Sequence, residues 1–167
     1  LGISEEFVRA SGTRLYTRDG TEFLDMTASY GALPFGHNPD FAVRAVRDFL
    51  GQSMPNLLKG NPGWLEAAAA ERLKAAFGAG RVIFTSGGAE TVNVALKAAR
   101  AITGRRRVVD FWSSFHGTTG DALRATGNSR FRDAFPESYG DDITLCRYND
   151  EAAAELAIAG GDVAAVL

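Results

Sequence analysis

Residues 81–111 read RVIFTSGGAETVNVALKAARAITGRRRVVDF, and this stretch decides the predicted fold. It opens with a short β-branched run, Arg81–Thr85, and continues in a helical pattern over residues 89–102 that Gly104 stops. It closes with a second apolar run, Arg107–Phe111. A strand, a helix and a strand in that order predict two parallel strands joined by a helical crossover. The stretch therefore indicates an α/β protein.

The same pattern recurs towards the C-terminus. Residues 143–148 predict a strand, residues 150–159 a helix, and residues 163–167 a further strand. We therefore expect a mostly parallel sheet that is covered by helices on both faces. The final run reads as the middle of a buried strand, with no turn or cap after it. For that reason we also expect the chain to be a truncated part of a longer polypeptide.

The N-terminal third has a different organisation. The pair Asp19-Gly20 separates two short strand-forming runs and predicts a hairpin with a tight two-residue turn. A loop rich in Gly and Pro follows over residues 30–39. After it, residues 40–50 predict a helix that its first residue caps. An alanine-rich helix is predicted over residues 64–77.

Composition and charge exclude several classes of protein. The chain has 167 residues, of which 46% are hydrophobic and 23% charged, unlike a disordered chain, a collagen or a small disulfide scaffold. A formal net charge of −2, spread along the chain, argues against a dedicated nucleic-acid-binding protein. The basic cluster Arg105–Arg107 is interpreted as a set of solvated side chains at the start of a strand.

Cysteine content and hydropathy indicate whether a disulfide, a zinc site or a membrane segment is expected. The single cysteine, Cys146, can form neither an internal disulfide nor a Cys-rich zinc site, and the sequence contains no metal-ligand spacing. The sequence shows no signal-peptide pattern and no apolar stretch long enough to cross a membrane. The expected location is therefore the cytoplasm, and no membrane partner is expected.

The strongest local feature is Phe84–Glu90, FTSGGAE, where a predicted strand ends in a glycine pair and a helix begins at once. Glycine allows the backbone to approach an anion closely, and the unpaired N–H groups of a helix's first turn point at it. The sequence thus predicts a phosphate site, with a tight turn that binds no ligand as the alternative. Neither G-x-G-x-x-G nor Gly-Lys-Ser/Thr is present, which disfavours a dinucleotide-dependent dehydrogenase and a P-loop protein.

A second candidate loop, Ser113–Thr119, follows the predicted strand Arg107–Phe111 and should leave the sheet at the same carboxyl edge. Its Phe115 could stack on a planar cofactor. The alternative is that Phe115 is ordinary core and His116 a hydrogen-bonded structural histidine. The motif Gly36–Pro39, GHNP, has a comparable alternative, a turn that its histidine fixes through the ring nitrogens.

Taken together and in this order, five groups of residues resemble the class III aminotransferases. These are the ornithine, acetylornithine and ω-amino acid type enzymes of fold type I, which depend on pyridoxal 5'-phosphate (PLP). The resemblance extends over essentially the whole chain, and several motifs in register are more specific than any one of them. The matching groups are Asp19-Gly20 with Phe23–Asp25, Gly36–Pro39, Ser86–Glu90 with Ala95–Arg100, Thr103–Arg105, and Phe115–Gly117.

The resemblance implies roles for the matching residues. The backbone N–H groups of Gly88 and Ala89 hold the PLP phosphate, and Phe115 stacks on the pyridine ring. Tyr30 lies where ornithine-type members place a substrate-facing aromatic side chain. The cofactor-binding residues that the resemblance implies are Gly87, Gly88, Ala89, Glu90, Phe115 and His116, with Glu90 and His116 as supports of the site.

The resemblance also implies a division of the chain. Residues 1–50 are expected to belong with the small domain, and residues 51–167 to form the first, truncated part of the PLP-binding large domain. The loop Ser53–Leu58 resembles a segment that approaches the partner subunit's active site, which implies a homodimer. The family's cofactor lysine and the aspartate that pairs with the pyridine nitrogen would lie beyond Leu167. This stretch alone is therefore expected not to transaminate.

Two departures from the family pattern concern cofactor and substrate. Many members have Ser-Gly-Thr or Ser-Gly-Ser at the phosphate turn where this chain has Gly87-Gly88-Ala89, so binding would rest more on backbone groups. Enzymes for α-amino acids commonly carry an arginine after Phe-His-Gly. This chain has Thr118 there and so lacks a bidentate carboxylate partner. The sequence leaves open which donor and acceptor react.

Three functions are consistent with these observations. The first is the amino-terminal part of a class III aminotransferase, which transfers an amino group between an amine or amino acid and a keto or aldehyde acceptor. The second is another PLP reaction of the same class, as in racemases, aminomutases and decarboxylases. The third is a non-catalytic PLP-fold fragment, because the cofactor lysine is absent from the chain.

Overall fold

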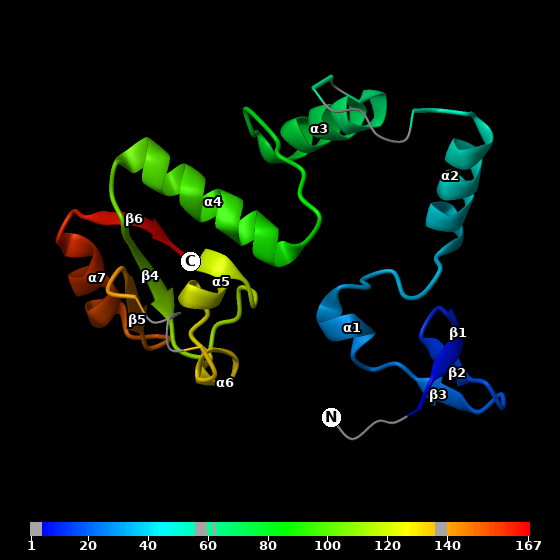
Figure 1. Ribbon diagram of the computed structural model, residues 1–167, viewed down its shortest axis with the longest axis horizontal. Coiled ribbons are helices and arrows are strands. Elements are labelled where there is room, and N and C mark those ends of the chain that lie inside the picture. Colours follow the sequence, from blue (N-terminus) through cyan, green and yellow to red (C-terminus); the bar gives the residue numbers. More distant parts are fainter. Residues whose placement is uncertain (1–4, 56–59, 62, 136–139) are drawn as a thin grey trace. The chain divides into compact units, whose positions relative to one another are not determined.

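The computed structural model describes residues 5–55, 60–61, 63–135 and 140–167, in two units that divide between Trp64 and Leu65 (Figure 1). The strands are β1 (Phe7–Ser11), β2 (Arg14–Thr17), β3 (Glu22–Leu24), β4 (Arg107–Phe111), β5 (Ile143–Cys146) and β6 (Val163–Val166). The helices are α1 (Ala28–Gly31), α2 (Asp40–Gly51), α3 (Trp64–Phe77), α4 (Gly88–Thr103), α5 (Gly120–Ala125), α6 (Ser129–Arg132) and α7 (Glu151–Ala159). The predicted domain division after residue 50 concerns the complete fold and stays a prediction.

The first unit contains a small antiparallel sheet with the strand order β1-β2-β3. The predicted hairpin at Asp19-Gly20 is confirmed as the connection between β2 and β3, but its turn is one residue longer than expected. The Thr17 N–H donates to the Thr21 carbonyl at 3.1 Å, and Gly20 has φ +89°, as the last residue of a three-residue loop requires. Asp19 stabilises this longer loop, because its carboxylate accepts from the Thr21 N–H at 3.2 Å.

Asp25, directly after β3, ties the sheet to the following loop. One carboxylate oxygen accepts from the Thr27 and Ala28 N–H groups, both at 2.9 Å, and the other lies 3.0 Å from His37 Nε2. Hydrogen bonds from the Thr27 hydroxyl, the largest cause, and from His37 lower the pKa of Asp25 to about 2. His37 therefore has the role of fixing its turn through a ring nitrogen.

The segment after Asp25 contains a left-handed turn. Ala28, Ser29 and Tyr30 in α1 have φ values of +46°, +51° and +57°. This geometry costs an L-residue about 1–2 kcal/mol, because Cβ approaches the carbonyl oxygen. Three such residues in succession store strain, and the hydrogen bonds to Asp25 at the start of the turn help to hold it.

The helices predicted over residues 40–50 and 64–77 are confirmed as α2 and α3. The predicted cap of α2 is wrong, because the N-cap is Pro39 and no side chain caps the helix. Pro39 has an extended conformation (φ −63°, ψ 134°), and its carbonyl accepts from the Ala42 N–H at 3.0 Å. Asp40 instead lies in the first turn, where its charge complements the helix dipole.

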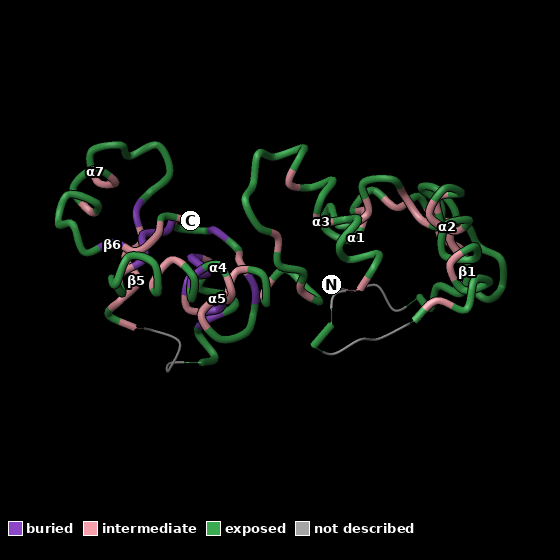
Figure 2. The backbone as a smooth tube through the Cα atoms, turned by 90° about the horizontal axis from the view of Figure 1, so that it is seen from above, coloured by how far each residue is buried: buried purple, intermediate pink, exposed green. Residues whose placement is uncertain are grey.

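The second unit is built on a parallel sheet with the strand order β5-β4-β6. Adjacent residues of β4 face opposite sides, as in any strand. Val108 packs with Leu96 of α4 and Ala125 of α5, whereas Val109 lies in a cluster that Ala157 of α7 covers. Buried residues gather in this unit along the strands and on α5 (Figure 2). The expected parallel sheet with helices on both faces is confirmed for the described residues.

The predicted strand Arg81–Thr85 does not form in the structure. The parallel partners of β4 are β5 and β6, and neither is the segment before α4. A β-branched run becomes a strand only where another strand takes up its backbone hydrogen bonds, and no neighbouring strand among the described residues does so here. Ile83 and Phe84 remain 68% and 50% exposed as a result.

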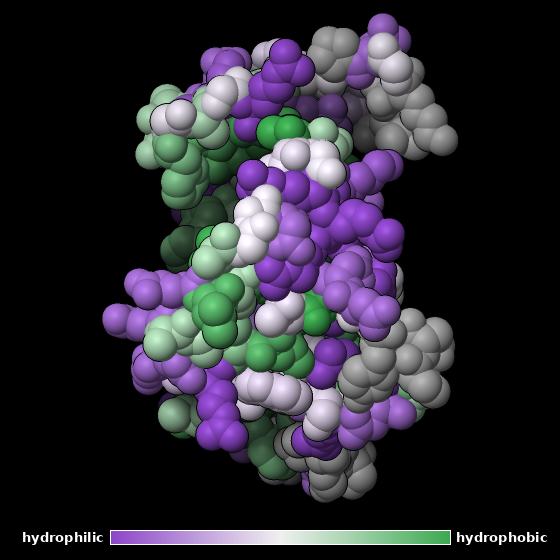
Figure 3. Space-filling model, turned by 90° about the vertical axis from the view of Figure 1, so that its left-hand side faces the viewer, coloured by the Kyte–Doolittle hydropathy of each residue, from purple (hydrophilic) through white to green (hydrophobic). Residues whose placement is uncertain are grey.

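Further apolar side chains are exposed in the second unit. Leu156 and Ile158 of α7 are 79% and 43% exposed. One face of the molecule shows hydrophobic surface between hydrophilic side chains (Figure 3). Large apolar side chains exposed in this way are costly in water.

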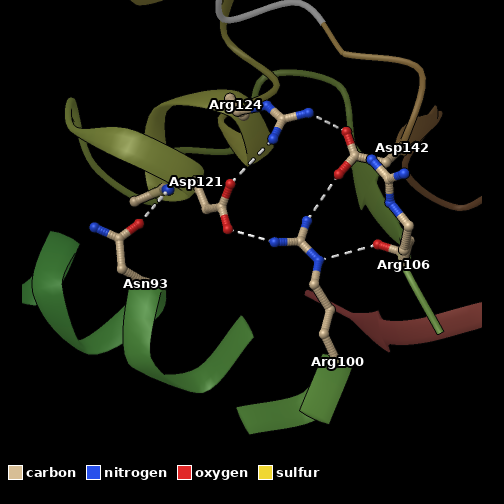
Figure 4. Close-up of polar contacts among 7 residues, drawn as sticks. Asn93, Arg100, Arg106, Asp121, Arg124 and Asp142 are labelled. Atoms are coloured by element: carbon tan, nitrogen blue, oxygen red, sulfur yellow. Dashed lines mark hydrogen bonds and ion pairs between the residues drawn. The ribbon is translucent and has the colours of Figure 1, made fainter. Parts of the chain in front are cut away.

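Four charged side chains tie α4 and α5 to the loop before β5 (Figure 4). Arg100 donates to Asp121 and, at 3.0 Å, to Asp142, and Arg124 donates to the same two carboxylates. Each carboxylate bridges both guanidinium groups, which closes a ring of alternating charges. Asn93 adds a second tie, because its Oδ1 accepts a backbone N–H of α5 at 2.8 Å. These ion pairs are partly buried, and each guanidinium bridges two carboxylates, so the ring restrains the positions of both helices.

Arg107 organises the amino end of the sheet. Its guanidinium makes a bidentate ion pair with Asp162 at 2.9 and 2.6 Å, and it also donates to Thr144 Oγ1 at 3.2 Å. The hydrogen bond between the partners raises the pKa of Arg107 and lowers that of Asp162. Arg107 therefore joins β4, β5 and the loop before β6, a structural role that its interpretation as a solvated side chain missed.

Replacing Asp25 by Asn should destabilise the protein strongly near neutral pH and much less near pH 2. Folding lowers the pKa of Asp25 from 3.8 to about 2, so its contribution to stability is complete above pH 3.8 and disappears as the pH falls through about 2. Urea unfolding of both proteins across this pH range measures the difference. Asp48→Asn removes an exposed carboxylate of α2 as a control, and an equal pH dependence in both variants would contradict the assignment.

Replacing Ser29 by Gly should leave stability unchanged or raise it by up to about 1 kcal/mol, because glycine relieves the strain of a left-handed residue. The matched control is Ala45→Gly at an exposed position of α2, which should cost about 1 kcal/mol. Chemical denaturation of both variants makes the comparison. Equal losses of stability would show that Ser29 is not strained.

Candidate functional site

The glycine turn lies at the start of α4, and its backbone is open to a ligand. Gly87 is the N-cap in an extended conformation (φ −170°, ψ 166°), and no side chain caps the helix. The first N–H groups of a helix have no partner within it. A Cβ atom on Gly87 or Gly88 would meet no atom of the described residues within 4 Å, so an anion can approach. The turn thus offers N–H donors at the positive end of the helix dipole.

Side chains on both sides hold the shape of the turn. Glu90 Oε2 accepts from the Ser86 N–H at 2.8 Å and so reaches back over the turn, much as in a capping box. The Thr91 hydroxyl donates to the Gly87 carbonyl at 3.1 Å and lies 2.5 Å from the Thr85 hydroxyl. These bonds use groups next to the turn and leave the N–H groups of its centre to a ligand.

The Phe115–Gly117 loop meets the glycine turn at one close contact. A Cβ atom on Gly117 would lie 2.5 Å from Ala89 Cβ and 2.9 Å from Ala89 Cα, closer than side chains approach. Gly117 also has φ +140°, a conformation that favours glycine. Only glycine at this position allows the two segments to touch. The structure therefore brings together the two motifs that the sequence presents as separate candidates.

Phe115 is not an ordinary core residue. Its side chain is 55% exposed and packs against Phe131 of α6, with ring centroids 4.8 Å apart and planes tilted by 57°. Phe115 lies two residues before Gly117, which contacts the glycine turn. Because its ring is half-exposed and is supported by a second ring, it is available to stack on a planar ligand.

A buried polar cluster lies behind this loop and includes His116. Asp110, near the end of β4, is fully buried; its Oδ1 lies 3.0 Å from His116 Nε2, and its Oδ2 accepts from the Ser114 hydroxyl. The Ser114 oxygen accepts from the Gly127 N–H at 2.9 Å, and Thr126 Oγ1 accepts from the His116 N–H at 3.1 Å. His116 is therefore hydrogen bonded through ring and backbone, as a structural histidine would be.

Sequence reasoning missed Asp110, Ser114 and Thr126 as contributors to this region. One signal was available, because Asp110 is the single charged residue among the last four residues of the apolar strand RVVDF. A carboxylate inside such a strand needs hydrogen-bond partners, and those partners follow it in the chain.

The remaining candidate residues lie elsewhere. Tyr30 belongs to the first unit, where it is 85% exposed on the left-handed turn α1. Its contact with substrate, like the cofactor roles of Gly87–Glu90 and Phe115-His116, stays a prediction. The loop Ser53–Leu58 lies outside the described residues from residue 56 onwards.

The described residues contain neither a metal cluster nor a membrane-spanning helix. Within residues 5–55, 60–61, 63–135 and 140–167, no group of three or more His, Cys, Asp and Glu side chains could hold a metal ion. In the same part of the chain, no helix combines the length and the hydropathy that crossing a membrane requires.

The chain is similar to known aminotransferases and aminomutases. The family model Aminotransferase class-III matches residues 4–163. Aminotransferase PigE from a Serratia species is 39% identical over 132 residues, which are 77% of this chain and 16% of that protein. Glutamate-1-semialdehyde 2,1-aminomutase from Methanothrix thermoacetophila is 33% identical over 166 residues, which are 95% of this chain and 38% of that protein.

A solved structure has the same fold. Taurine:2-oxoglutarate aminotransferase from Bifidobacterium kashiwanohense, in complex with PLP and glutamate, matches with a TM-score of 0.85 and 22% identity. The match covers 99% of this chain and 42% of that one, so the α/β fold expected from the sequence is confirmed as part of the aminotransferase fold. The chain spans well under half of the length of these relatives.

Replacing Gly117 by Ala should destabilise the second unit by about 1–3 kcal/mol, because the new Cβ overlaps Ala89. Adding Ala89→Gly removes Cβ, the nearer of the two overlapping Ala89 atoms, and should restore part of the loss, which a double-mutant cycle of chemical denaturation measures. Gly80→Ala, where a Cβ meets no described atom within 4 Å, is the control and should change stability by at most about 0.5 kcal/mol. Strictly additive effects of the two substitutions would contradict the contact.

Proposed function

The chain belongs to the class III aminotransferase family, and we propose that the complete protein is a PLP-dependent aminotransferase. It moves an amino group from an amine or amino acid donor to a keto or aldehyde acceptor. Because the chain spans well under half of its relatives, the activity is proposed for the complete polypeptide. The observation that carries the proposal is the contact of Gly117 with Ala89, which joins a phosphate-type turn to an exposed aromatic ring.

The described residues fit the phosphate end of PLP. The N–H groups of Gly88 and Ala89 lie in the uncapped first turn of α4, and the helix dipole favours an anion there. The open space at Gly87 and Gly88 leaves room for phosphate oxygens. No hydroxyl side chain lies at positions 87–89, so the backbone supplies the donors.

Each residue of the site then has a physical task. Phe115 stacks on the cofactor ring and keeps water from one of its faces. Glu90 holds the Ser86 N–H and so fixes the turn, while His116 anchors the loop that carries Phe115. Tyr30 contacts the substrate in the complete protein. When bound, PLP supplies the electron sink for chemistry at the amino carbon.

Thr118, the residue after Gly117, concerns how a carboxylate of the substrate would be bound. Thr118 has no positive charge with which to bind a carboxylate. We therefore propose that any α-carboxylate of the donor is bound by another part of the protein, or that the donor is an amine without one. A donor screen of the complete protein tests this proposal. It would be contradicted if the wild type accepted only donors with an α-carboxylate and if substitution of Thr118 abolished that requirement.

A second candidate reaction is amino-group migration within one substrate. It is favoured by the aminomutase from Methanothrix thermoacetophila, which is 33% identical over 95% of this chain. Both reactions use the same phosphate turn and the same aromatic ring. They differ in whether a separate donor is consumed.

We also propose that the complete protein is a cytoplasmic homodimer whose active sites lie at the subunit interface. The resemblance of Ser53–Leu58 to a segment that approaches the partner's site supports the dimer. The single Cys146, which is buried and free, is compatible with a reducing compartment. Sedimentation of the complete protein at several concentrations tests the dimer.

The complete protein should convert an amine donor and a keto or aldehyde acceptor into one equivalent each of carbonyl and amine product. The measurement is quantification of both products with a panel of donors. Rearrangement of a single substrate without consumption of a donor would establish the aminomutase instead. PLP binding without either reaction would favour the non-catalytic alternative.

Replacing Phe115 by Ala should weaken PLP binding about tenfold, because the ring contact with the cofactor is lost. Phe115→Tyr keeps the ring and should bind nearly as well as the wild type. Ile102→Ala changes a residue of α4 that is 85% exposed and serves as a remote control. Titration of the apoprotein with PLP, followed by absorption, measures the affinities, and unchanged binding by Phe115→Ala would contradict the stacking role.

A further inference from the structure

We propose that Asp110 is a positioning residue of the cofactor site, which acts through His116 and Ser114. The inference rests on the proposed function, because it concerns how Phe115 is held against PLP. Asp110 lies one residue before the end of β4, at the edge of the sheet from which the Phe115–Gly117 loop departs. It is fully buried, and both of its carboxylate oxygens have side-chain partners.

The hydrogen bonds of the cluster define where its protons lie. The Ser114 oxygen accepts the Gly127 N–H at 2.9 Å, which leaves the Ser114 proton for Asp110 Oδ2. With Asp110 as the acceptor, the 3.0 Å contact between its Oδ1 and His116 Nε2 places a proton on Nε2, and this bond fixes both the tautomer and the direction of the ring.

The same cluster anchors the backbone on both sides of Phe115. The residue before it, Ser114, accepts at its carbonyl from the Asn128 N–H at 3.1 Å. The residue after it, His116, donates its N–H to Thr126 Oγ1, also at 3.1 Å. With both neighbours held, the direction of the Phe115 ring follows from the backbone. Asp110 is the one side chain in this cluster that binds the side chains of both neighbours.

The burial of a charge at this position supports an organising role. A buried carboxylate is costly unless its oxygens are hydrogen bonded, and an apolar residue would fill the strand at lower cost. The two residues before Asp110, Val108 and Val109, show this, since both are fully buried in apolar clusters. What Asp110 adds, and valine could not, is the fixed geometry of His116 and Ser114.

The test uses Asp110→Asn in the complete protein. Asn keeps the shape, and its amide oxygen should face Ser114, whose hydroxyl proton still needs an acceptor. Nδ2 then faces and donates to His116, so His116 Nε2 becomes an acceptor and its proton moves to Nδ1. We expect PLP to bind about tenfold more weakly and its induced circular dichroism to change. Nitrogen-15 NMR should show the change of tautomer at the His116 signal, which is assigned by its loss in His116→Gln.

Two further variants separate positioning from a general loss of structure. Ser114→Ala keeps the carboxylate and removes one partner, so it should weaken PLP binding in the same direction by a smaller factor, even if Asp110→Asn folds poorly. Asp162→Asn is the matched control, because it makes the same change of charge in the ion pair with Arg107 at the opposite end of β4. It should leave PLP affinity and the His116 signal unchanged.

The outcomes distinguish this inference from the proposed function. Two results would overturn the role of Asp110 if the wild type still binds PLP. One is an equal loss of PLP affinity in Asp110→Asn and Asp162→Asn. The other is an Asp110→Asn variant in which both the His116 tautomer and the PLP affinity are unchanged. A complete wild-type protein that does not bind PLP would overturn the proposed function, and this inference with it.

Discussion

Gly117 and Ala89 approach so closely that a methyl group at position 117 would overlap the Ala89 side chain, and the geometry of the candidate site depends on this steric constraint. Ala89 belongs to the first turn of α4, where the free N–H groups lie, and Gly117 ends the loop that carries Phe115. The contact brings the glycine turn, which is predicted to bind phosphate, next to the loop that carries an exposed aromatic ring.

Two sets of polar interactions hold the partners of this contact in place. On one side, the ring of Arg100, Asp121, Arg124 and Asp142 ties α4 to α5 and to the loop before β5. On the other side, the buried carboxylate of Asp110 ties the end of β4 to the loop after it. The first set holds the C-terminal part of α4 against α5, and the second holds the loop that follows β4. Asp110, Arg100, Asp121 and Arg124 lie in regular elements, and their hydrogen bonds position the loops that carry the candidate residues.

Local patterns in the sequence were sufficient to predict most of the helices and strands. They failed where the conformation depends on residues that are distant in the chain. The helices of residues 64–77 and 89–102 follow from periodicity and from Gly78 and Gly104, which end them. The run Arg81–Thr85 has strand composition but forms no strand, because pairing depends on residues far away in the chain. The glycine turn and Phe115 could be identified from spacing and resemblance, whereas the bonds from Asp110 to Ser114 and His116 depend on the path of the loop after β4. The left-handed turn at residues 28–30 has no composition signal, because Ala, Ser and Tyr all disfavour it.

The most direct measurement is a crystal structure of the complete protein with PLP. The account predicts that the phosphate accepts hydrogen bonds from the backbone N–H groups of Gly88 and Ala89 and that the cofactor ring stacks on Phe115. The contact between Gly117 and Ala89 should be unchanged. A phosphate held away from the start of α4, or a cofactor ring without contact to Phe115, would contradict the account.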